Sequence, residues 1–398
     1  MRISTSQIHN AGLDSIQRQQ VEMSRAQTQL ASGKRILSPA DDPGGAVQSL
    51  QFREAIARLD QFARNGGMAE ARLNHEEVVL AQVMDGMQRV RELAIQGNNA
   101  TQTPETRRAI AGEVRQQLEA LYELANTRDA NGEYLFAGFD SLDRPFSMGA
   151  GGVSYSGSDQ AREIAISEER RVRLGDAGDA VFMNIPEGNG RFVVTEAAAN
   201  TGSGVVQETT VRTEGAWDGG TRTLRFTAPG TWEAVDADGS VAATGTHAPG
   251  ETLVVDGLAI RLDGTPAAGD TFELRPAGGR DMFGIYADLA TALESGATTP
   301  AERAQLNGAI GRTLADLDQA GEQVSSIRST VGSRLNAIDG QAEMRGIETL
   351  ALQETLSEIE DLDYAEAISR FNLRMVGLQA AQQSYSMLAR FSLFDYMR

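Results

Sequence analysis

Residues 314–359 read "LADLDQAGEQVSSIRSTVGSRLNAIDGQAEMRGIETLALQETLSEI", and apolar side chains recur in them at alternating steps of three and four residues. The repeat runs from Leu314 through Val331 to Ile359. Four residues interrupt it: Gly321, Arg328, Arg345 and Thr349. A seven-residue repeat of this length predicts a left-handed coiled coil. The alternative is one amphipathic helix packed on a globular core.

The other end of the chain is also helical in pattern, because residues 10–31 place apolar side chains at helical intervals along a half-polar seam. The stretch "LSPADDPGGAVQSL" at 37–50 follows, and its adjacent carboxylates raise the question of a metal site. No further ligands stand nearby, so we expect a joint in which Asp42 caps the next helix and Pro43 is its first residue. Two further pairs of this kind are Thr103-Pro104 and Thr299-Pro300.

The composition changes after residue 140, where glycine and threonine become frequent and apolar residues alternate with polar ones, as in "ETLVVDGLAIRLDG" at 251–264. Alternation is typical of strands, and Asp256-Gly257 between two such runs predicts a two-residue hairpin. Helical patterns return at residue 281. Helices at both ends are accommodated most simply if they pack together and the β-rich stretch is an insertion.

The expected fold class is therefore α+β and multidomain, with a long α-helical coiled-coil rod formed by both chain ends and an inserted β-rich domain. The expected divisions are an N-terminal assembly segment (1–35), the N-terminal half of the helical rod domain (36–140), the inserted β-rich outer domain (141–280), the C-terminal half of the rod domain (281–363) and a C-terminal assembly helix (364–398).

Composition narrows the range of partners. The net charge of −19 argues against binding to nucleic acid or to an anionic membrane. No stretch approaches the roughly 18 apolar residues of a membrane span. The start "MRISTSQIHN" lacks the apolar core of a cleaved signal peptide, so any export is expected to use another route. Cysteine is absent, which excludes disulfides, thiolate catalysis and thiolate zinc sites.

A search for a catalytic centre finds no candidate constellation. The three histidines, His9, His75 and His247, are far apart in sequence, and "HEEVV" at 75–79 lacks the second histidine of a zinc-protease helix. "DADGSVAATGTH", which begins at Asp236, lacks the glycine and the final acid of a calcium loop and predicts a hairpin turn instead. We therefore expect no enzymatic activity, no cofactor and no metal site.

The terminal helices carry more apolar surface than one seam can bury in a single chain, and each large apolar side chain removed from water contributes about 1.5–3 kcal/mol. This surplus predicts contacts with other chains. The alternative is that these residues complete an internal core. The predicted assembly residues are Ile8, Leu13, Ile16, Met23, Leu30, Phe371, Met375, Leu378, Tyr385, Leu388, Phe391, Leu393 and Phe394.

Four stretches resemble the flagellin family of bacterial flagella. They are "MRIST" at 1–5, "LASGKRILSPADDPGGAVQS" at 30–49, "NGEYLFAGFDSLDRPF" at 131–146 and "DLDYAEAISRFNLRMVGLQAAQQSYS" at 361–386. The resemblance covers both helical ends, and Tyr134 to Gly138 is its most specific element.

The resemblance implies a secreted, extracellular component of the flagellum that travels unfolded through the flagellar type III export apparatus. It also implies that an export chaperone covers the C-terminal helix before export and that the ends become ordered on assembly. The partners implied are other copies of the chain, a hook-side hook-associated protein and flagellin, and the role implied is a structural adapter between hook and filament.

Three alternatives stand beside this reading. The first is the filament subunit, flagellin, whose ends are similar to those of this chain. The second is an exported enzyme with a zinc-protease insertion, although no H-E-x-x-H stands in 141–280. The third is an adhesin that binds glycans through its β-rich domain.

Overall fold

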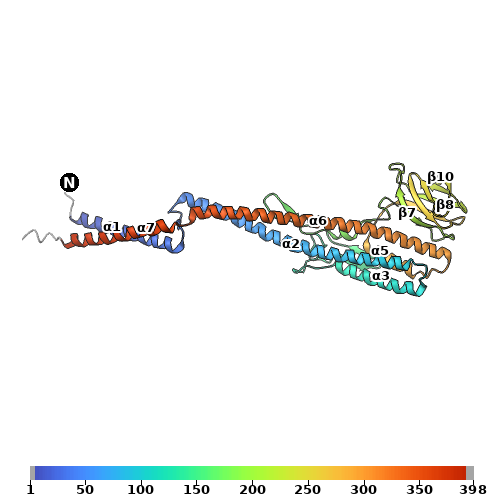
Figure 1. The fold of residues 1–398 in the computed structure, drawn as a ribbon, viewed down its shortest axis with the longest axis horizontal. Helices are drawn as coiled ribbons and strands as arrows, with labels where there is room; N and C mark the ends of the chain where they lie inside the picture. Colours follow the sequence, from blue (N-terminus) through green and yellow to red (C-terminus); the bar gives the residue numbers. More distant parts are fainter. Residues whose placement is uncertain (1–4, 391–398) are drawn as a thin grey trace, which may run out of the picture. The chain divides into compact units, whose positions relative to one another are not determined.

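The computed structural model describes residues 5–390, without the side chains of residues 5, 6, 8, 9 and 388–390. Helices lie at both ends of the chain and strands lie between them (Figure 1). The helices are α1 (Thr5–Ser32), α2 (Pro43–Gly97), α3 (Pro104–Ala125), α4 (Gly178–Phe182), α5 (Met282–Glu294), α6 (Pro300–Glu360) and α7 (Tyr364–Arg390). The expected class, α+β with a β-rich region between helical ends, is confirmed.

The strands form two larger sheets and three two-stranded ones. The first group is β1 (Phe146–Gly149), β2 (Gly152–Tyr155), β3 (Glu163–Ala165), β4 (Arg171–Arg173) and β5 (Ile185–Pro186). The second group is β6 (Phe192–Glu196), β7 (Val205–Val211), β8 (Arg222–Ala228), β9 (Thr231–Asp236), β10 (Val241–Thr246), β11 (Thr252–Val255), β12 (Leu258–Asp263), β13 (Thr271–Pro276) and β14 (Gly279–Arg280).

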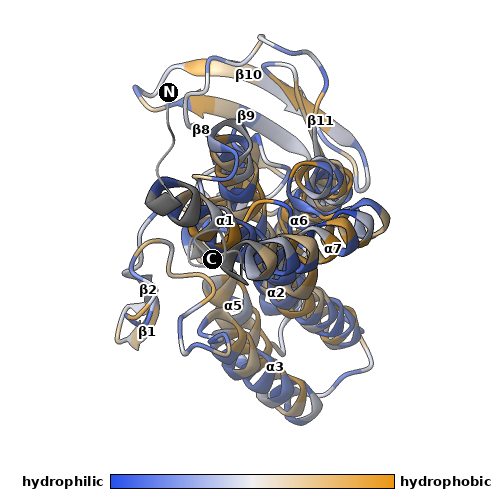
Figure 2. Ribbon diagram, turned by 90° about the vertical axis from the view of Figure 1, so that its left-hand side faces the viewer, coloured by the Kyte–Doolittle hydropathy of each residue, from blue (hydrophilic) through white to orange (hydrophobic). Residues whose placement is uncertain are grey.

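The described chain divides into two compact units, of which the larger is residues 65–339 and the smaller joins residues 1–64 to residues 340–398. The larger unit has a continuous helical core. Its buried side chains come from α2, α3, α5 and α6 and include Leu80, Val114 and Tyr286. α5 is largely orange in Figure 2, because most of its residues are apolar and buried in this core, whereas Asp288 and Thr291 lie on an exposed face.

The heptad seam of α6 contributes directly to this core. Its positions Leu317, Val324, Val331 and Ile338 are buried in the larger unit. From residue 342 onward, in the smaller unit, the seam positions are half-buried or exposed. The same sequence repeat therefore has two different environments along one helix.

The β-rich stretch has two separate cores, a subdivision that the sequence does not reveal. Residues of its first part, such as Phe146, Val172 and Phe182, belong to the helical core. The part from β6 to β13 forms a β module (residues 192–276) with its own buried cluster, which includes Phe226, Ile260 and Phe272.

The β module is built from two antiparallel sheets. One has the strand order β10-β9-β8-β13-β6 and the other β11-β12-β7. β6 lies against β7 and β10 against β11, so the edges of the sheets cover each other. The predicted hairpin at Asp256-Gly257 is confirmed, since both residues have positive φ (48° and 76°) and join the paired strands β11 and β12. The turn after Asp236 likewise joins β9 to β10.

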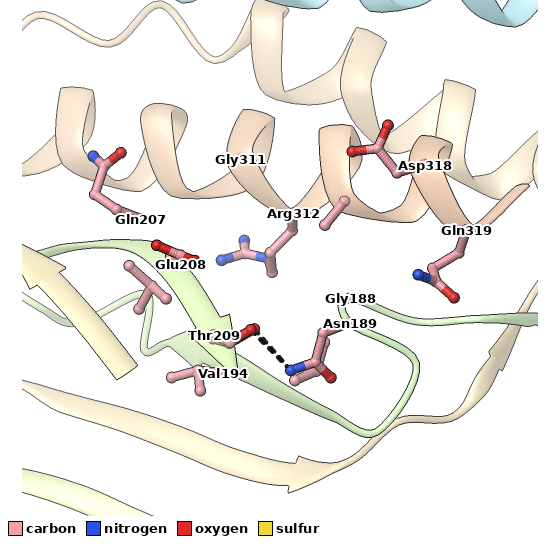
Figure 3. Close-up of a pocket in the computed structure, with 13 residues that line it drawn as sticks. Gly188, Asn189, Val194, Gln207, Glu208, Thr209, Gly311, Arg312, Asp318 and Gln319 are labelled. Carbon is pink, nitrogen blue, oxygen red and sulfur yellow. Dashed lines mark hydrogen bonds between the residues drawn. The ribbon is translucent and has the colours of Figure 1, made fainter. Parts of the chain in front are cut away.

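A groove of about 290 Å³ lies between the β module and α6, lined by polar residues of both (Figure 3). Asn189, in the chain before β6, donates a hydrogen bond to the Thr209 carbonyl oxygen on β7 (3.1 Å). Arg312 of α6 pairs with Glu196 of β6, and Asp316 of α6 accepts the N–H of Gly188 (2.7 Å). The Arg312–Glu196 pair therefore attaches the β module to α6, and Asp316 holds the chain that leads into the module.

Candidate assembly surface and the joint between the chain ends

The turn after α1 is tied to the turn after α6. Gly33 has a positive φ of 70°, and a Cβ there would lie 2.9 Å from the Tyr364 hydroxyl, so glycine fits both the turn and the contact. Its carbonyl accepts the N–H of Leu362 (2.9 Å), and the N–H of Arg35 donates to the Glu360 carbonyl oxygen (2.6 Å). The two chain ends are thus joined by backbone hydrogen bonds.

A buried carboxylate reinforces this joint. Glu360 contacts Lys34, the single lysine of the chain, at 2.7 Å and Arg53 at 2.6 Å. Burial by itself would raise the pKa of Glu360, but the hydrogen bonds from Lys34 and Arg53 outweigh it and lower that pKa. Arg35 also donates to the Ile359 carbonyl oxygen (2.7 Å), at the end of α6 where carbonyl groups lack helical partners.

The adjacent carboxylates of the joint have structural partners. α2 begins at Pro43, and Asp42 accepts the N–H of Gly45 (2.9 Å), which is the main reason that its pKa is lowered. Asp41 accepts the N–H groups of Leu37 and Ser38, both at 2.9 Å. Both carboxylates therefore serve the turn itself.

α1 and α7 lie side by side and antiparallel (Figure 1). Tyr385 packs on Gly12, where a Cβ would lie 3.0 Å from its ring, and Arg374 pairs with Glu22 (2.8 Å). Where Gly377 leaves open space, a groove of about 400 Å³ runs between the two helices. The pair therefore touches along its length without closing into a filled core.

The predicted assembly residues lie in different environments. Leu378 is buried, and Leu13 and Met375 are exposed. Ile16, Met23, Leu30, Phe371 and Tyr385 are half-buried. The side chains of Ile8 and Leu388, and Phe391, Leu393 and Phe394 as a whole, lie outside the described residues. Part of the predicted seam is thus covered by α1 and α7 themselves, and its contact with other copies stays a prediction.

The sequence reasoning missed a second set of apolar residues that lie off the seam. Val21 and Leu373 are 69% and 71% exposed, far more than the seam residues themselves. The others are Val376 on α7, Val47 and Leu50 on α2, and Met344, Ile347 and Leu350 on α6. Counting apolar residues outside the strongest seam would have found them, because they recur at helical spacing on a different face.

Within the described part of the chain, no group of three or more histidine, aspartate or glutamate side chains is placed to hold a metal ion. Within the same residues, no helix is long and apolar enough to cross a membrane.

Both helical ends match known families. The family of the bacterial flagellin N-terminal helical region matches residues 3–141, and that of the bacterial flagellin C-terminal helical region matches residues 314–397. Flagellar hook-associated protein 3 of Escherichia coli K12 is 23% identical over 395 residues, which cover 99% of each chain. Its Salmonella typhimurium counterpart is 31% identical over 185 residues, 46% of this chain and 58% of that protein.

Solved structures agree with these sequence matches. The crystal structure of FlgL from Xanthomonas campestris is 32% identical, has a TM-score of 0.73 and aligns over 77% of this chain and 99% of that one. Flagellar hook-associated protein 3 from Legionella pneumophila is 28% identical, with a TM-score of 0.75 over 78% of this chain and 98% of that one.

Two flagellin-type helical ends around a β-rich insertion define a flagellin-type chain. Flagellins of Salmonella match only 130 residues, 33% of this chain and 26% of theirs, whereas a hook-associated protein 3 matches nearly its whole length. The chain therefore belongs to the flagellin family, within the group of flagellar hook-associated protein 3.

Proposed function

We propose that this protein is a structural adapter of the bacterial flagellum, which joins the hook side to the flagellin filament through packing of its terminal helices. The whole-length match to a flagellar hook-associated protein 3 supports this role over that of the filament subunit. The proposed partners are other copies of the chain, a hook-side hook-associated protein and flagellin.

One observation carries the proposal. Among described residues, the smaller unit buries only two apolar side chains, Ala26 and Leu378, whereas the larger unit has two extensive cores. A unit with so little buried apolar area cannot offset the conformational entropy of its own ordering. It is therefore suited to be completed by apolar surfaces of neighbouring subunits, in the way that a segment folds on binding.

Each segment of the chain has its own proposed role. Segments 1–35 and 364–398 are the proposed assembly elements, 36–140 and 281–363 the helical rod, and 141–280 the region that faces away from the assembly axis. We further propose that the chain acts without turnover, with no enzymatic activity. We also propose export through the flagellar type III apparatus, with a chaperone covering the C-terminal helix beforehand.

Immunogold labelling of isolated flagella tests the location, and we expect the label at the filament's hook-proximal end alone. A label along the whole filament would show that the chain is the filament subunit. A strain without the gene should secrete flagellin into the medium and lack filaments.

Point variants test the surface. Replacing both Leu373 and Val376 by glutamine should abolish filament attachment while leaving far-UV circular dichroism unchanged, because both side chains are largely exposed in the single chain. Replacing Asn372 and Gln379, which are exposed polar residues of the same helix, by alanine is the matched control and should leave motility intact. Normal filaments in the Leu373/Val376 variant would count against assembly through this face.

A further inference from the structure

Glu76 of α2 is a buried carboxyl group in the larger unit, with only 1% of its surface exposed. One of its oxygens, Oε1, accepts the backbone N–H of Asp176 at 2.9 Å. The other oxygen, Oε2, accepts no hydrogen bond from any described residue. An ionised carboxylate in such a place would lack the partners that normally offset its loss of hydration.

The charged groups around Glu76 come from three elements. Asp176, in the chain after β4, brings a second carboxylate to the same site. Arg334 of α6 binds that carboxylate with two hydrogen bonds of 2.8 and 2.9 Å. Arg72, one turn before Glu76 on α2, is the third. The guanidinium of Arg334 is therefore paired with Asp176 and not with Glu76.

Arg72 also pairs with carboxylates other than Glu76. It pairs with Asp129 (2.6 Å) and Glu133 (3.2 Å) and donates to the Tyr134 carbonyl oxygen (2.9 Å). Arg162 supplies a third guanidinium, which pairs with Glu133. Four carboxyl groups, including Glu76, thus share three guanidinium groups, and Glu76 is the one that makes no direct ion pair.

These surroundings favour the neutral form of Glu76. Burial raises its pKa most, and repulsion by Asp176 raises it further, whereas the Asp176 N–H and the charges of Arg334 and Arg72 only partly offset this, so the pKa reaches about 8. Asp176 connects Glu76 on α2 to Arg334 on α6 near the end of the 159–177 segment, which contains β3 and β4 and is also held by Ile166 and Val172 in the helical core.

We propose that Glu76 is a proton-binding latch: its neutral carboxyl holds the 159–177 segment against α2 and α6, and loss of its proton releases that segment. An ionised Glu76 would stand beside the Asp176 carboxylate, and two like charges in a buried site repel strongly. Relief of this repulsion requires Asp176 to move away, and with it the segment that it anchors. The inference rests on the fold alone and does not depend on the proposed function.

The sign of the effect follows from linkage. In the unfolded chain Glu76 would ionise near its ordinary value of about 4.3, so folding takes up a proton at neutral pH. The contribution of Glu76 to the protection of the segment is therefore complete below the unfolded value and is lost as the pH rises from there through the folded-state value.

Amide hydrogen exchange of the full-length protein at pH 6 and pH 9, corrected for intrinsic exchange, tests the latch. We expect protection of residues 159–177 to fall by at least about tenfold between these values, the equivalent of one pKa unit. Glu76→Gln, which keeps a neutral acceptor for the Asp176 N–H, should retain its protection within about twofold. Glu77→Gln is the matched control, because Glu77 is the next residue of α2 but pairs with Arg328.

A second variant keeps the test decisive if Glu76→Gln fails to fold. Asp176→Asn removes the repelling charge and leaves Arg334 free to pair with an ionised Glu76, so protection of residues 159–177 should change by less than about twofold between pH 6 and pH 9. A loss of protection in Asp176→Asn or Glu76→Gln as large as that of the wild-type protein, or no loss in the wild-type protein, would overturn the proposal.

Discussion

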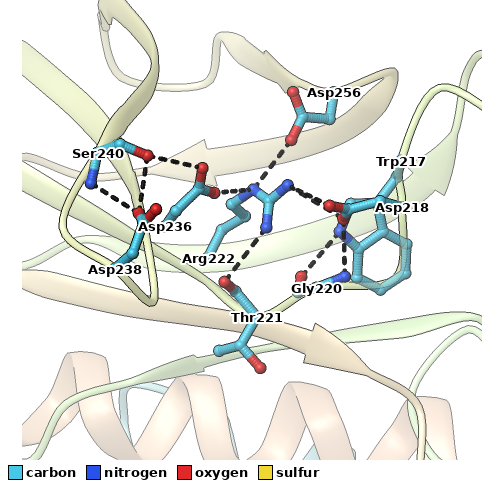
Figure 4. A network of polar contacts seen from close by, with 9 residues as sticks. All are labelled: Trp217, Asp218, Gly220, Thr221, Arg222, Asp236, Asp238, Ser240 and Asp256. Carbon is cyan, nitrogen blue, oxygen red and sulfur yellow. Dashed lines mark hydrogen bonds and ion pairs between the residues drawn. The ribbon is translucent and has the colours of Figure 1, made fainter.

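Arg222 on β8 connects the two sheets of the β module, and its replacement should have a large and local effect. Its side chain is only 11% exposed and pairs with Asp236 (2.5 Å), at the end of β9, and with Asp256 (3.1 Å), in the β11–β12 turn (Figure 4). It also pairs with the more exposed Asp218 (3.0 Å). One guanidinium thus holds carboxylates from both sheets.

Replacing Arg222 by methionine keeps the aliphatic stem but leaves these carboxylates unpaired. Removing one partner of a fully buried pair costs about 3–5 kcal/mol, and the partial exposure of Asp236 and Asp256 reduces this to about 2–3 kcal/mol. The control is Arg225→Met on the same strand, because Arg225 is half-exposed and has one carboxylate partner, Glu233. Its loss should cost less than about 1 kcal/mol.

The chain provides a selective probe for this measurement. Its two tryptophans, Trp217 and Trp232, both pack on the core of the β module, and Trp217 donates to the Gly220 carbonyl oxygen beside the Arg222 cluster (2.9 Å). Urea unfolding followed by tryptophan fluorescence therefore reports on this module. With a slope of about 1–2 kcal/mol per M, we expect the midpoint for Arg222→Met to fall by about 1–3 M. Equal midpoints for the Arg222 and Arg225 variants would refute the reasoning.

Three further predictions concern other residues. Burial lowers the pKa of His247, so the unfolded chain binds more protons than the folded chain, and the β module should lose stability as the pH falls below about 6.5. The His247→Phe variant should lose less stability over this range in the same fluorescence assay. Gly138→Ala should lower the melting temperature by several degrees more than Gly132→Ala. Both glycines have positive φ, but only at Gly138 would an added Cβ meet the Ser158 carbonyl oxygen, at 2.3 Å. Equal shifts would show that backbone strain alone matters. Glu360→Gln should weaken the joint by about 1–2 kcal/mol, seen as faster hydrogen exchange in residues 33–45, and unchanged exchange would contradict the role assigned to this carboxylate.

The local sequence determined the helix starts and turns, because each depends on only a few neighbouring residues. α2 begins at Pro43 and α6 at Pro300, because a proline with a preceding capping side chain favours a helix start whatever surrounds it. The Asp256-Gly257 hairpin depends only on residues that tolerate positive φ. The heptad of α6 likewise predicted buried positions in the larger unit, such as Val324 and Val331, but its positions from residue 342 onward are half-buried or exposed. The family resemblance also lay in contiguous stretches of the two ends.

Tertiary structure alone decided which distant residues meet. Glu76 and Asp176 are 100 residues apart, and Arg222 is 34 residues from Asp256, so no local pattern pairs them. The division of the β-rich stretch into two cores was decided in the same way. Burial, and the pKa shifts that it causes, depend on how the elements pack, and this packing involves the whole chain. Helix caps and turns depend instead on backbone dihedral angles that neighbouring residues set.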